Sequence, residues 1–364
     1  MAQNPLTVAA AGDIIPSRPL FPGGDPVTPG LAGVVELIGA ADVAVANLDS
    51  ALTTRGYPKE KLITVRARPD VVAPDVAKLG FGVISVANNH STDYGEVGLL
   101  DTLAALEGAG VRAIGGGETL AAASAPAIVE TGDWRVGVIA YSSVLPTGAA
   151  ASADRPGLAP LHVHTAYETN PYHLMEEPGT PPVVRSHADE AELAAASEAV
   201  ALLREQVDFV VVLLHWGGGV SDELYEYQGP LGRALLDAGA DVVIGSHPHR
   251  ILGIERHGDK AIFYSPGTLI EQVDRESVAP DMRALLNMLS PDSFVATLTV
   301  APGGGYSIRL TPTTIDAHGV PMIAKGEAYE RIAKRIVEMS AATGTHVEEQ
   351  SGQLVVALGS AAVV

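Results

Sequence analysis

Five short segments of the sequence place polar side chains directly after an apolar run. Two such runs are residues 6–11 and 207–214, which are rich in Ala, Val and Leu. Runs of this kind predict strands of a parallel sheet that is buried on both faces. In open α/β sheets the functional side chains gather at the carboxyl ends of such strands. The five segments are Ala11-Gly12-Asp13, Asn47-Leu48-Asp49, Asn88-Asn89-His90-Ser91-Thr92-Asp93, His215-Trp216-Gly217 and Gly245-Ser246-His247-Pro248-His249.

Together these segments bring three carboxylates, three amides and four imidazoles to one edge of the predicted sheet. Oxygen and nitrogen ligands of this kind suit a divalent ion such as Ca²⁺, Mn²⁺ or Mg²⁺. The chain has no cysteine, which excludes disulfides, thiolate ligands and a cysteine nucleophile. The sequence therefore predicts a metal-dependent enzyme whose ligands are oxygen and nitrogen atoms alone.

Strand patterns and helix patterns alternate over the first two thirds of the chain, which is typical of an α/β fold with right-handed crossovers. Strands are predicted at residues 6–11, 43–48, 82–88, 134–141, 207–215, 241–246 and 261–265. Helices are predicted at residues 189–206, 229–239 and roughly 325–342. Residues 294–300 and 306–310 flank a Gly-rich turn and predict an antiparallel hairpin that closes the sheet.

Residues 142–188 interrupt this alternation. The segment contains seven prolines and four histidines and has no helix or strand periodicity. A loop of this length inside a domain is typically a lid, a binding loop or disordered. We therefore predict one domain over residues 1–345 with a lid-like insertion at about 142–188, followed by a C-terminal tail at 346–364. The insertion's histidines are predicted to be solvated loop positions rather than ligands; they are His162, His164, His173 and His187.

The charge balance limits the partners. The chain has 23 basic and 43 acidic residues, a net charge of −20, so its field repels nucleic acid and anionic membranes. No uncharged apolar run approaches the roughly 20 residues that span a bilayer. No signal segment precedes the first predicted strand. The expected partner is a peptide or small-molecule substrate, the expected location is the cytoplasm, and the oligomeric state is left open.

As a set, the five motifs resemble the CapA family, which is named for poly-γ-glutamate capsule synthesis and belongs to the calcineurin-like metallophosphoesterase superfamily. The match runs in order from about residue 6 to residue 270. Near its end, Tyr264-Ser265-Pro266-Gly267-Thr268 is similar to the family's tyrosine-serine-leucine-glycine-asparagine turn. The resemblance implies an α/β fold in the form of a calcineurin-like four-layer α/β/β/α sandwich, with a metal site at the strand carboxyl ends.

The resemblance also implies roles for individual residues. His90 is the expected acid/base histidine, and Asp93 lies close enough in sequence to orient it. A second acid/base pair is expected from His247 or His249 with Asp13 or Asp49. The expected metal ligands are Asp13, Asp49, Asn89, His215, His247 and His249.

Three departures from the family pattern bear on the metal. Two-metal phosphoesterases carry a histidine two residues after the first aspartate, where this chain has Ile15. Family members often have glutamate at the position of Asp49 and asparagine at the position of Thr268. Because one of the two metal positions loses a ligand, we predict a single oxygen-rich site rather than a dinuclear one.

Three functions follow from this site. The lasso-peptide epimerase branch of the family is similar in being cytoplasmic, metal-dependent and unanchored, so the leading prediction is two-base epimerisation at a Cα of a ribosomal peptide. The alternative is hydrolysis of a phosphoester or of a γ-glutamyl or other amide bond. A third reading is a peptide-binding protein with a vestigial site, against which the nearly complete set of polar groups argues.

Overall fold

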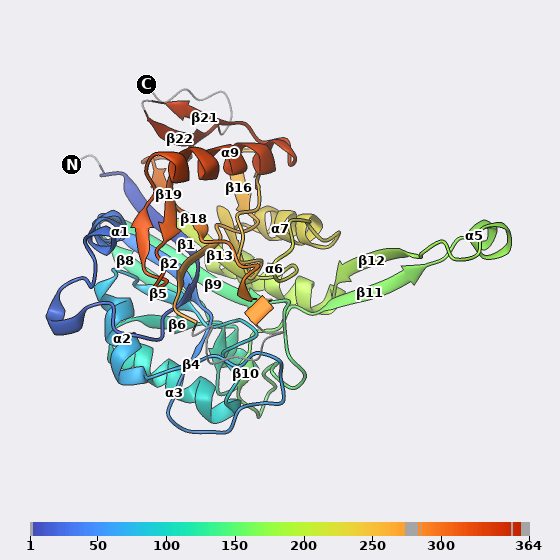
Figure 1. Cartoon of the computed structure of the whole chain (residues 1–364), viewed down its shortest axis with the longest axis horizontal. Helices are drawn as coiled ribbons and strands as arrows, with labels where there is room; N and C mark the ends of the chain where they lie inside the picture. The colour runs from blue at the N-terminus through green and yellow to red at the C-terminus, as the bar shows by residue number, and fades with distance from the viewer. Residues whose placement is uncertain (1–2, 274–282, 285, 351, 358–364) are drawn as a thin grey trace.

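Two large β-sheets form the centre of the protein, as the computed structural model shows (Figure 1). The structure describes residues 3–273, 283–284, 286–350 and 352–357. The first sheet has the order β21-β22-β19-β18-β1-β2-β5-β6, with β17 beside β1 and β20 beside β19. Its strands are β1 (Leu6–Ile15), β2 (Val43–Leu48), β5 (Val83–Ser85), β6 (Arg112–Ile114), β17 (Thr268–Glu271), β18 (Asp292–Val300), β19 (Tyr306–Ile315), β20 (Pro321–Ile323), β21 (Val347–Gln350) and β22 (Gln353–Val356).

The second sheet has the order β15-β16-β14-β13-β9-β8. Its four central strands are parallel, and an antiparallel strand closes each edge. Its strands are β8 (Ala127–Thr131), β9 (Trp134–Ser142), β13 (Phe209–His215), β14 (Val242–Ser246), β15 (Ile254–His257) and β16 (Lys260–Phe263). Three two-stranded sheets pair β3 (Ala51–Leu52) with β4 (Arg66–Ala67), β7 (Gly116–Gly117) with β10 (Gly157–Leu158), and β11 (Val163–Glu168) with β12 (Val183–Ala188).

Helices cover the outer face of each sheet. Buried side chains of α1, α2 and α3 pack on the first sheet, and those of α6 and α7 pack on the second. The helices are α1 (Pro29–Gly39), α2 (Pro69–Lys78), α3 (Gly95–Gly108), α4 (Leu120–Ala123), α5 (Pro171–Glu176), α6 (Glu190–Arg204), α7 (Gln228–Asp237) and α9 (Glu327–Ala341). The layers therefore run α/β/β/α, and the expected four-layer sandwich is confirmed.

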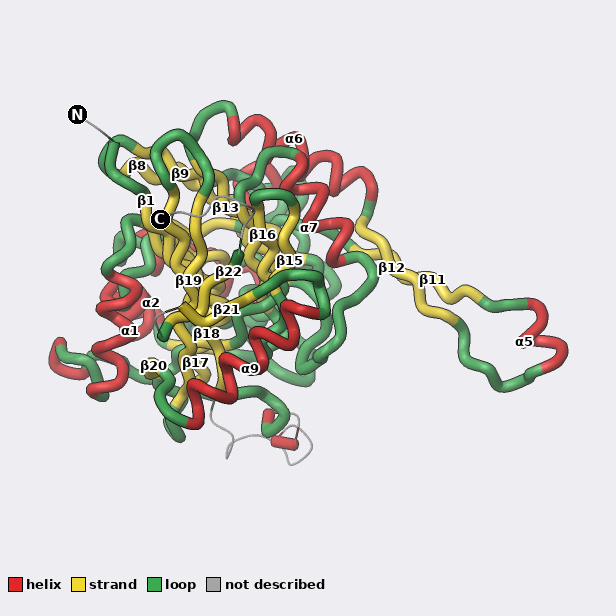
Figure 2. The backbone as a smooth tube through the Cα atoms, turned by 90° about the horizontal axis from the view of Figure 1, so that it is seen from above, coloured by secondary structure: helices red, strands yellow, loops and turns green. Residues whose placement is uncertain are grey.

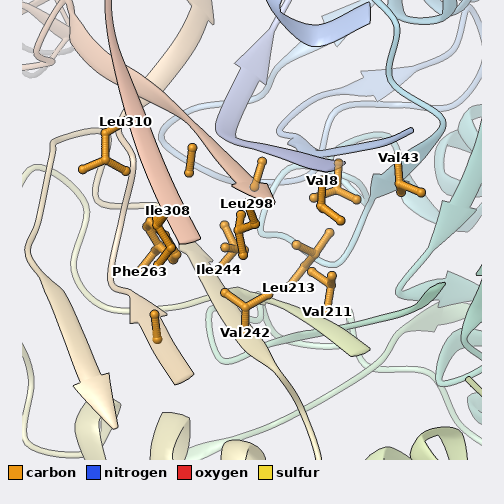
Figure 3. Close-up of a cluster of buried hydrophobic side chains, with 14 of the residues drawn as sticks. Val8, Val43, Val211, Leu213, Val242, Ile244, Phe263, Leu298, Ile308 and Leu310 are labelled. Atoms are coloured by element: carbon orange, nitrogen blue, oxygen red, sulfur yellow. The ribbon is translucent and has the colours of Figure 1, made fainter. Parts of the chain in front are cut away.

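The strands owe their continuous apolar sequences to burial on both faces. In β13, Val211 and Leu213 join the core between the two sheets, whereas Val210, Val212 and Leu214 pack under helices α6 and α7. Figure 3 shows the inter-sheet core, where Val211 and Leu213 lie near side chains from strands of both sheets. Successive residues of a strand point to opposite faces, so both sets must be apolar.

The predicted elements agree with the structure. Strand β2 has the predicted bounds, and the ends of the other six predicted strands either coincide with the prediction or differ from it by one to four residues. The three predicted helices and the hairpin of β18 with β19 are also present. Gly12 is needed because β1 and β17 approach closely there: a Cβ at this position would lie 2.1 Å from the carbonyl oxygen of Gly267.

The predicted tail differs from the structure. Strands β21 and β22 form a hairpin that pairs with β19, and Val347, Leu354 and Val356 are buried in the inter-sheet core. Helix α9 packs against β19 and β21 (Figure 2). Residues 358–364 of the predicted tail lie outside the described residues. The sequence analysis did not predict the β21–β22 hairpin, because each of its strands has only four residues, too few for a clear alternation of apolar and polar side chains.

The segment predicted to be a lid, residues 142–188, is divided between the body of the protein and a projecting arm. Residues 158–161 are largely buried in the body, but β11 and β12 form an arm with α5 at its tip that extends away from the body in both views (Figure 1; Figure 2). Glu226 binds Arg185 and the backbone of Ser186 and thereby fixes the base of the arm. No helix in the described part of the chain is long and apolar enough to cross a membrane.

Candidate metal centre and acid/base pair

The side chains that the sequence predicted for the site converge from strands of both sheets. Asp13 lies in β1 and Asp49 follows β2, while His215 ends β13. Asn89 and His90 follow β5, and His247 and His249 follow β14. Because parallel strands of each sheet end at the same edge, the ends of these five strands meet where the two sheets come together.

A β-bulge points Asp13 into this meeting point. The register of β1 shifts between Ala10 and Asp13 relative to β2, and again after Asp13 relative to β17. The carboxylate is fully buried and accepts hydrogen bonds from the Asn47 side-chain amide at 2.8 Å and from the His247 backbone N–H at 2.9 Å. Bulges commonly re-aim a side chain beside an active site.

Asp49 has the least compensated carboxylate in the cluster. Both of its oxygens are buried and have no hydrogen-bond partner. Its Oδ1 lies 3.9 Å from Nε2 of His215 and its Oδ2 lies 3.7 Å from Nε2 of His249. Burial, reinforced by the nearby carboxylates of Asp13 and Asp93, raises the pKa of Asp49 well above its usual value. The site thus holds a carboxylate that lacks a positive partner.

Two histidines in the cluster are held neutral. Burial lowers the pKa of His215 and of His247 well below the usual value, and the neighbouring imidazoles lower it further. The Nε2 of His215 lies 2.8 Å from Oδ1 of Asn89 and its Nδ1 lies 2.9 Å from Oγ of Ser246. The Nδ1 of His247 is buried without a hydrogen-bond partner. A neutral imidazole is the form that binds a metal.

The turn after β14 holds its two histidines in an unusual backbone conformation. His247 has φ 98° and His249 has φ 52°, a region that residues other than glycine adopt infrequently. The Nδ1 of His249 lies 3.0 Å from the Thr268 hydroxyl and 3.5 Å from Oδ2 of Asp13. Such conformations persist where the surroundings fix them, and they cluster at functional sites.

His90 and Asp93 form the expected pair beside the cluster. The Nδ1 of His90 lies 2.7 Å from Oδ2 of Asp93, so Nε2 is the nitrogen left for chemistry. Burial lowers the pKa of His90 although Asp93 opposes the shift. Asp93 is fully buried and also binds the Lys61 ammonium and, at 2.7 Å, the Val65 backbone N–H.

Three polar residues to which the sequence analysis gave no individual role support the site. Asn47 donates to Asp13, and Asn88 donates to the Asn47 side chain at 3.1 Å. The Asn88 side-chain oxygen also accepts from the backbone of His90 and Ser91, which shapes that turn. Lys61 binds Asp93 and the Asn89 carbonyl. Both asparagines stand in the motifs, whereas no sequence pattern marks Lys61.

The cluster suits a divalent cation, although in the described part of the chain no three His, Asp or Glu side chains are already arranged to hold one. Its N-to-O separations of 3.5–3.9 Å are too long for hydrogen bonds. Two ligands about 2.1 Å from a shared ion lie at most about 4.2 Å apart, so these separations fit ligands of one ion. The unpartnered atoms of Asp49 and His247 would gain a partner.

A pocket of about 200 Å³ opens beside the cluster. Its polar lining consists of Asp49, Asn89, His90, His247 and His249. No residue of the predicted lid at 142–188 lines it. His162 and His164 instead bind the acidic first turn of α6 and its N-cap, which agrees with the prediction that they are not ligands.

The fold and the buried Asp/His cluster describe an α/β/β/α protein with a candidate metal site where its two sheets meet. The profile of the family described as "Bacterial capsule synthesis protein PGA_cap" matches residues 7–273, and the chain belongs to this family. The CapA resemblance is thereby confirmed. The match carries nothing specific to the lasso-peptide epimerase branch.

Similar proteins are found in several bacteria. A probable polyglutamine synthesis accessory protein of Mycobacterium tuberculosis is 31% identical over 281 residues, covering 76% of this chain and 67% of its own. The capsule biosynthesis protein CapA of Bacillus anthracis is 28% identical, covering 68% and 54%. A solved hypothetical protein from Thermus thermophilus gives a TM-score of 0.41 at 15% identity, covering 87% and 96%. The layer architecture rests on the sheets and cores described above rather than on that likeness.

Proposed function

We propose that this protein is a metal-dependent hydrolase that cleaves an amide bond. The observation that carries the proposal is the buried Asp49 carboxylate. Both of its oxygens lack a partner, and they lie beside two imidazoles and next to the His90/Asp93 pair. An uncompensated buried charge is costly, whereas a bound cation neutralises it and supplies a Lewis acid.

The expected holders of the cation are Asp13, Asp49, Asn89, His215, His247 and His249. When bound, the ion would polarise the scissile carbonyl and stabilise the negative charge that develops on its oxygen. His90 is neutral before reaction because burial lowers its pKa, so it accepts a proton from the attacking water at Nε2. It then donates this proton to the leaving nitrogen, while Asp93 holds Nδ1–H and stabilises the imidazolium.

The pocket lining favours an amide over a phosphoester. None of the described residues that line it is Lys or Arg. Phosphoryl groups are usually held by such cations, because each developing charge needs a fixed positive partner. An amide is neutral before attack and needs stabilisation at one oxygen only.

The metal requirement is tested by elemental analysis and by titration of chelator-treated protein with Mn²⁺. Wild type is expected to bind the ion, and Asp49→Asn is expected to lose most of that affinity. Asp70→Asn removes an exposed carboxylate on α2 that pairs with Arg68, and it is the matched control that should bind as wild type does. Equal binding by all three proteins would refute the proposed role of Asp49.

Epimerisation at a peptide Cα is the second candidate. The supporting observation is that two neutral imidazoles, those of His90 and His247, line one pocket. Removal and return of a Cα proton on opposite faces needs two such groups.

Solvent hydrogen separates the two reactions. Epimerisation in deuterated water adds one deuteron to the peptide without shortening it, whereas hydrolysis splits the peptide and leaves its Cα hydrogens in place. Mass spectrometry of a peptide incubated with metal-loaded protein distinguishes them. Exchange at Cα without cleavage would overturn the hydrolase proposal.

A further inference from the structure

We infer that the pocket beside the metal centre selects an uncharged, apolar substituent next to the reacting bond, and therefore disfavours an anionic side chain such as glutamate. The inference rests on the proposed function only in naming a bond that reacts. The preference for an apolar substituent depends on the residues that line the pocket.

The apolar part of the pocket lining is aliphatic. Seven of the thirteen described lining residues are Ile, Val or Leu: Ile15, Ile63, Val65, Val220, Val273, Leu286 and Leu289. They come from four separate parts of the chain, namely the end of β1, the loop between β3 and β4, the loop after β13 and the region between β17 and β18. An apolar wall built from four segments indicates a surface shaped to contact a group that leaves water.

The pocket takes one substituent rather than a whole substrate. Its volume of about 200 Å³ is below the roughly 300–1,000 Å³ of pockets that enclose a drug-sized ligand. Ile15, at the end of β1, is one of the aliphatic residues that line it.

None of the described side chains that line the pocket is a Lys or Arg that could pair with an anionic substituent, and a bound metal ion would already be shared with the carboxylates that hold it. Lys61, which belongs to the same loop as the lining residues Ile63 and Val65, directs its ammonium to the Asp93 carboxylate and the Asn89 carbonyl. The net charge of −20 acts in the same direction at longer range.

The backbone holds part of the wall in place. Val220 has φ 57°, which is rare for a β-branched residue, and its N–H donates to the Pro248 carbonyl at 3.1 Å. This bond ties the wall directly to the turn that carries His247 and His249, so the apolar and polar sides of the pocket keep a fixed relation.

The test compares the affinities of three probes for Mn²⁺-loaded protein, each measured by NMR titration. The probes are the N-acetyl amides of leucine, glutamine and glutamate, which share the same backbone; glutamine and glutamate also have side chains of equal length and differ only in the end group. We expect the leucine probe to bind at least about 10-fold more tightly than the glutamate probe, with glutamine between them. Equal binding, tighter binding of glutamate, or no binding of any probe would overturn the inference.

Two arginine variants in adjacent positions supply the control. Ile63→Arg places a cation in the wall and should reverse the order of the leucine and glutamate probes. Leu62→Arg adds the same charge next to it, on a side chain that is 86% exposed and outside the pocket lining, and should leave the order unchanged. If Ile63→Arg fails to fold, Ile63→Ser should weaken the leucine probe several-fold, and unchanged binding would count against the wall.

The 4-nitroanilides of the same three N-acetyl amino acids separate this inference from the proposed function. Selective binding of the leucine probe with no metal-dependent release of nitroaniline would overturn amide hydrolysis and leave the pocket preference standing. Hydrolysis that is fastest for glutamate would leave the hydrolase standing and overturn the preference.

Discussion

Replacing Asp49 by asparagine should stabilise the metal-free protein and destabilise the metal-loaded one relative to wild type. The pKa of Asp49 is raised by burial and by neighbouring carboxylates, so its neutral form is favoured in the metal-free fold. The stability that follows from this neutral form is fully present below the ordinary pKa of aspartate and is lost as the pH rises through the raised value. The metal-free wild type is therefore expected to lose stability as the medium becomes alkaline.

The size of the effect follows from the missing partners. Leaving a buried polar group unsatisfied costs about 1–3 kcal/mol, and more when it is charged, so removing the charge at alkaline pH should return about that amount. At about 2.1 cal/mol/K of unfolding entropy per residue, a chain of 364 residues converts this gain into an increase in Tm of about 1–4 °C. A metal at 100 times its Kd adds about 2.7 kcal/mol to a protein that binds it. The order of stability should therefore invert between chelator and Mn²⁺.

Differential scanning calorimetry in chelator and in Mn²⁺, from about pH 5 to about pH 9, measures both effects. Asp75→Asn is the matched control, because Asp75 is also buried but already accepts a hydrogen bond from the Leu20 backbone N–H at 2.7 Å. It should lose about 1 kcal/mol with or without metal. Either of two results would refute the reasoning. One is an Asp49→Asn protein that is less stable than wild type in chelator at alkaline pH. The other is an Asp49→Asn protein whose free energy of unfolding increases on Mn²⁺ addition by as much as that of wild type.

Four further predictions concern the acid/base pair, the sheet edge and the arm. His90→Ala should abolish turnover while bound metal stays near the wild-type level, and loss of metal would instead make His90 a ligand. Lys61→Met leaves the buried Asp93 carboxylate without its cation and should cost about 3–5 kcal/mol of stability by denaturant titration; a change below 1 kcal/mol would count against the buried pair. Leu354→Ala should cost about 2–5 kcal/mol because Leu354 is buried in the inter-sheet core, whereas a tail outside the fold would make this substitution neutral. Replacing residues 166–185 by Asn-Gly should leave the Tm and metal binding unchanged, and loss of either would show that the arm contributes to the body.

The sequence by itself determined the central sheets and the members of the site. Strands such as β2 and β13 are buried on both faces, so their sequences are apolar without interruption and their ends are marked by a polar residue. The chain order of the motifs then placed Asp13, Asp49 and His90 at one edge, since parallel strands of one sheet end together, whereas His215 ends a strand of the second sheet.

Only the tertiary structure decided which groups touch and which lack partners. The unpartnered carboxylate of Asp49 and its separations from His215 and His249 depend on the angle between two sheets that are far apart in sequence. Lys61 reaches Asp93 from an irregular loop without a periodic pattern, and residues 347–356 form an edge hairpin only because β19 offers an unpaired edge. A short segment of sequence indicates which of its side chains are buried and how apolar residues alternate along it. Contacts between loops depend instead on the packing of segments far apart in the chain, which no short segment encodes.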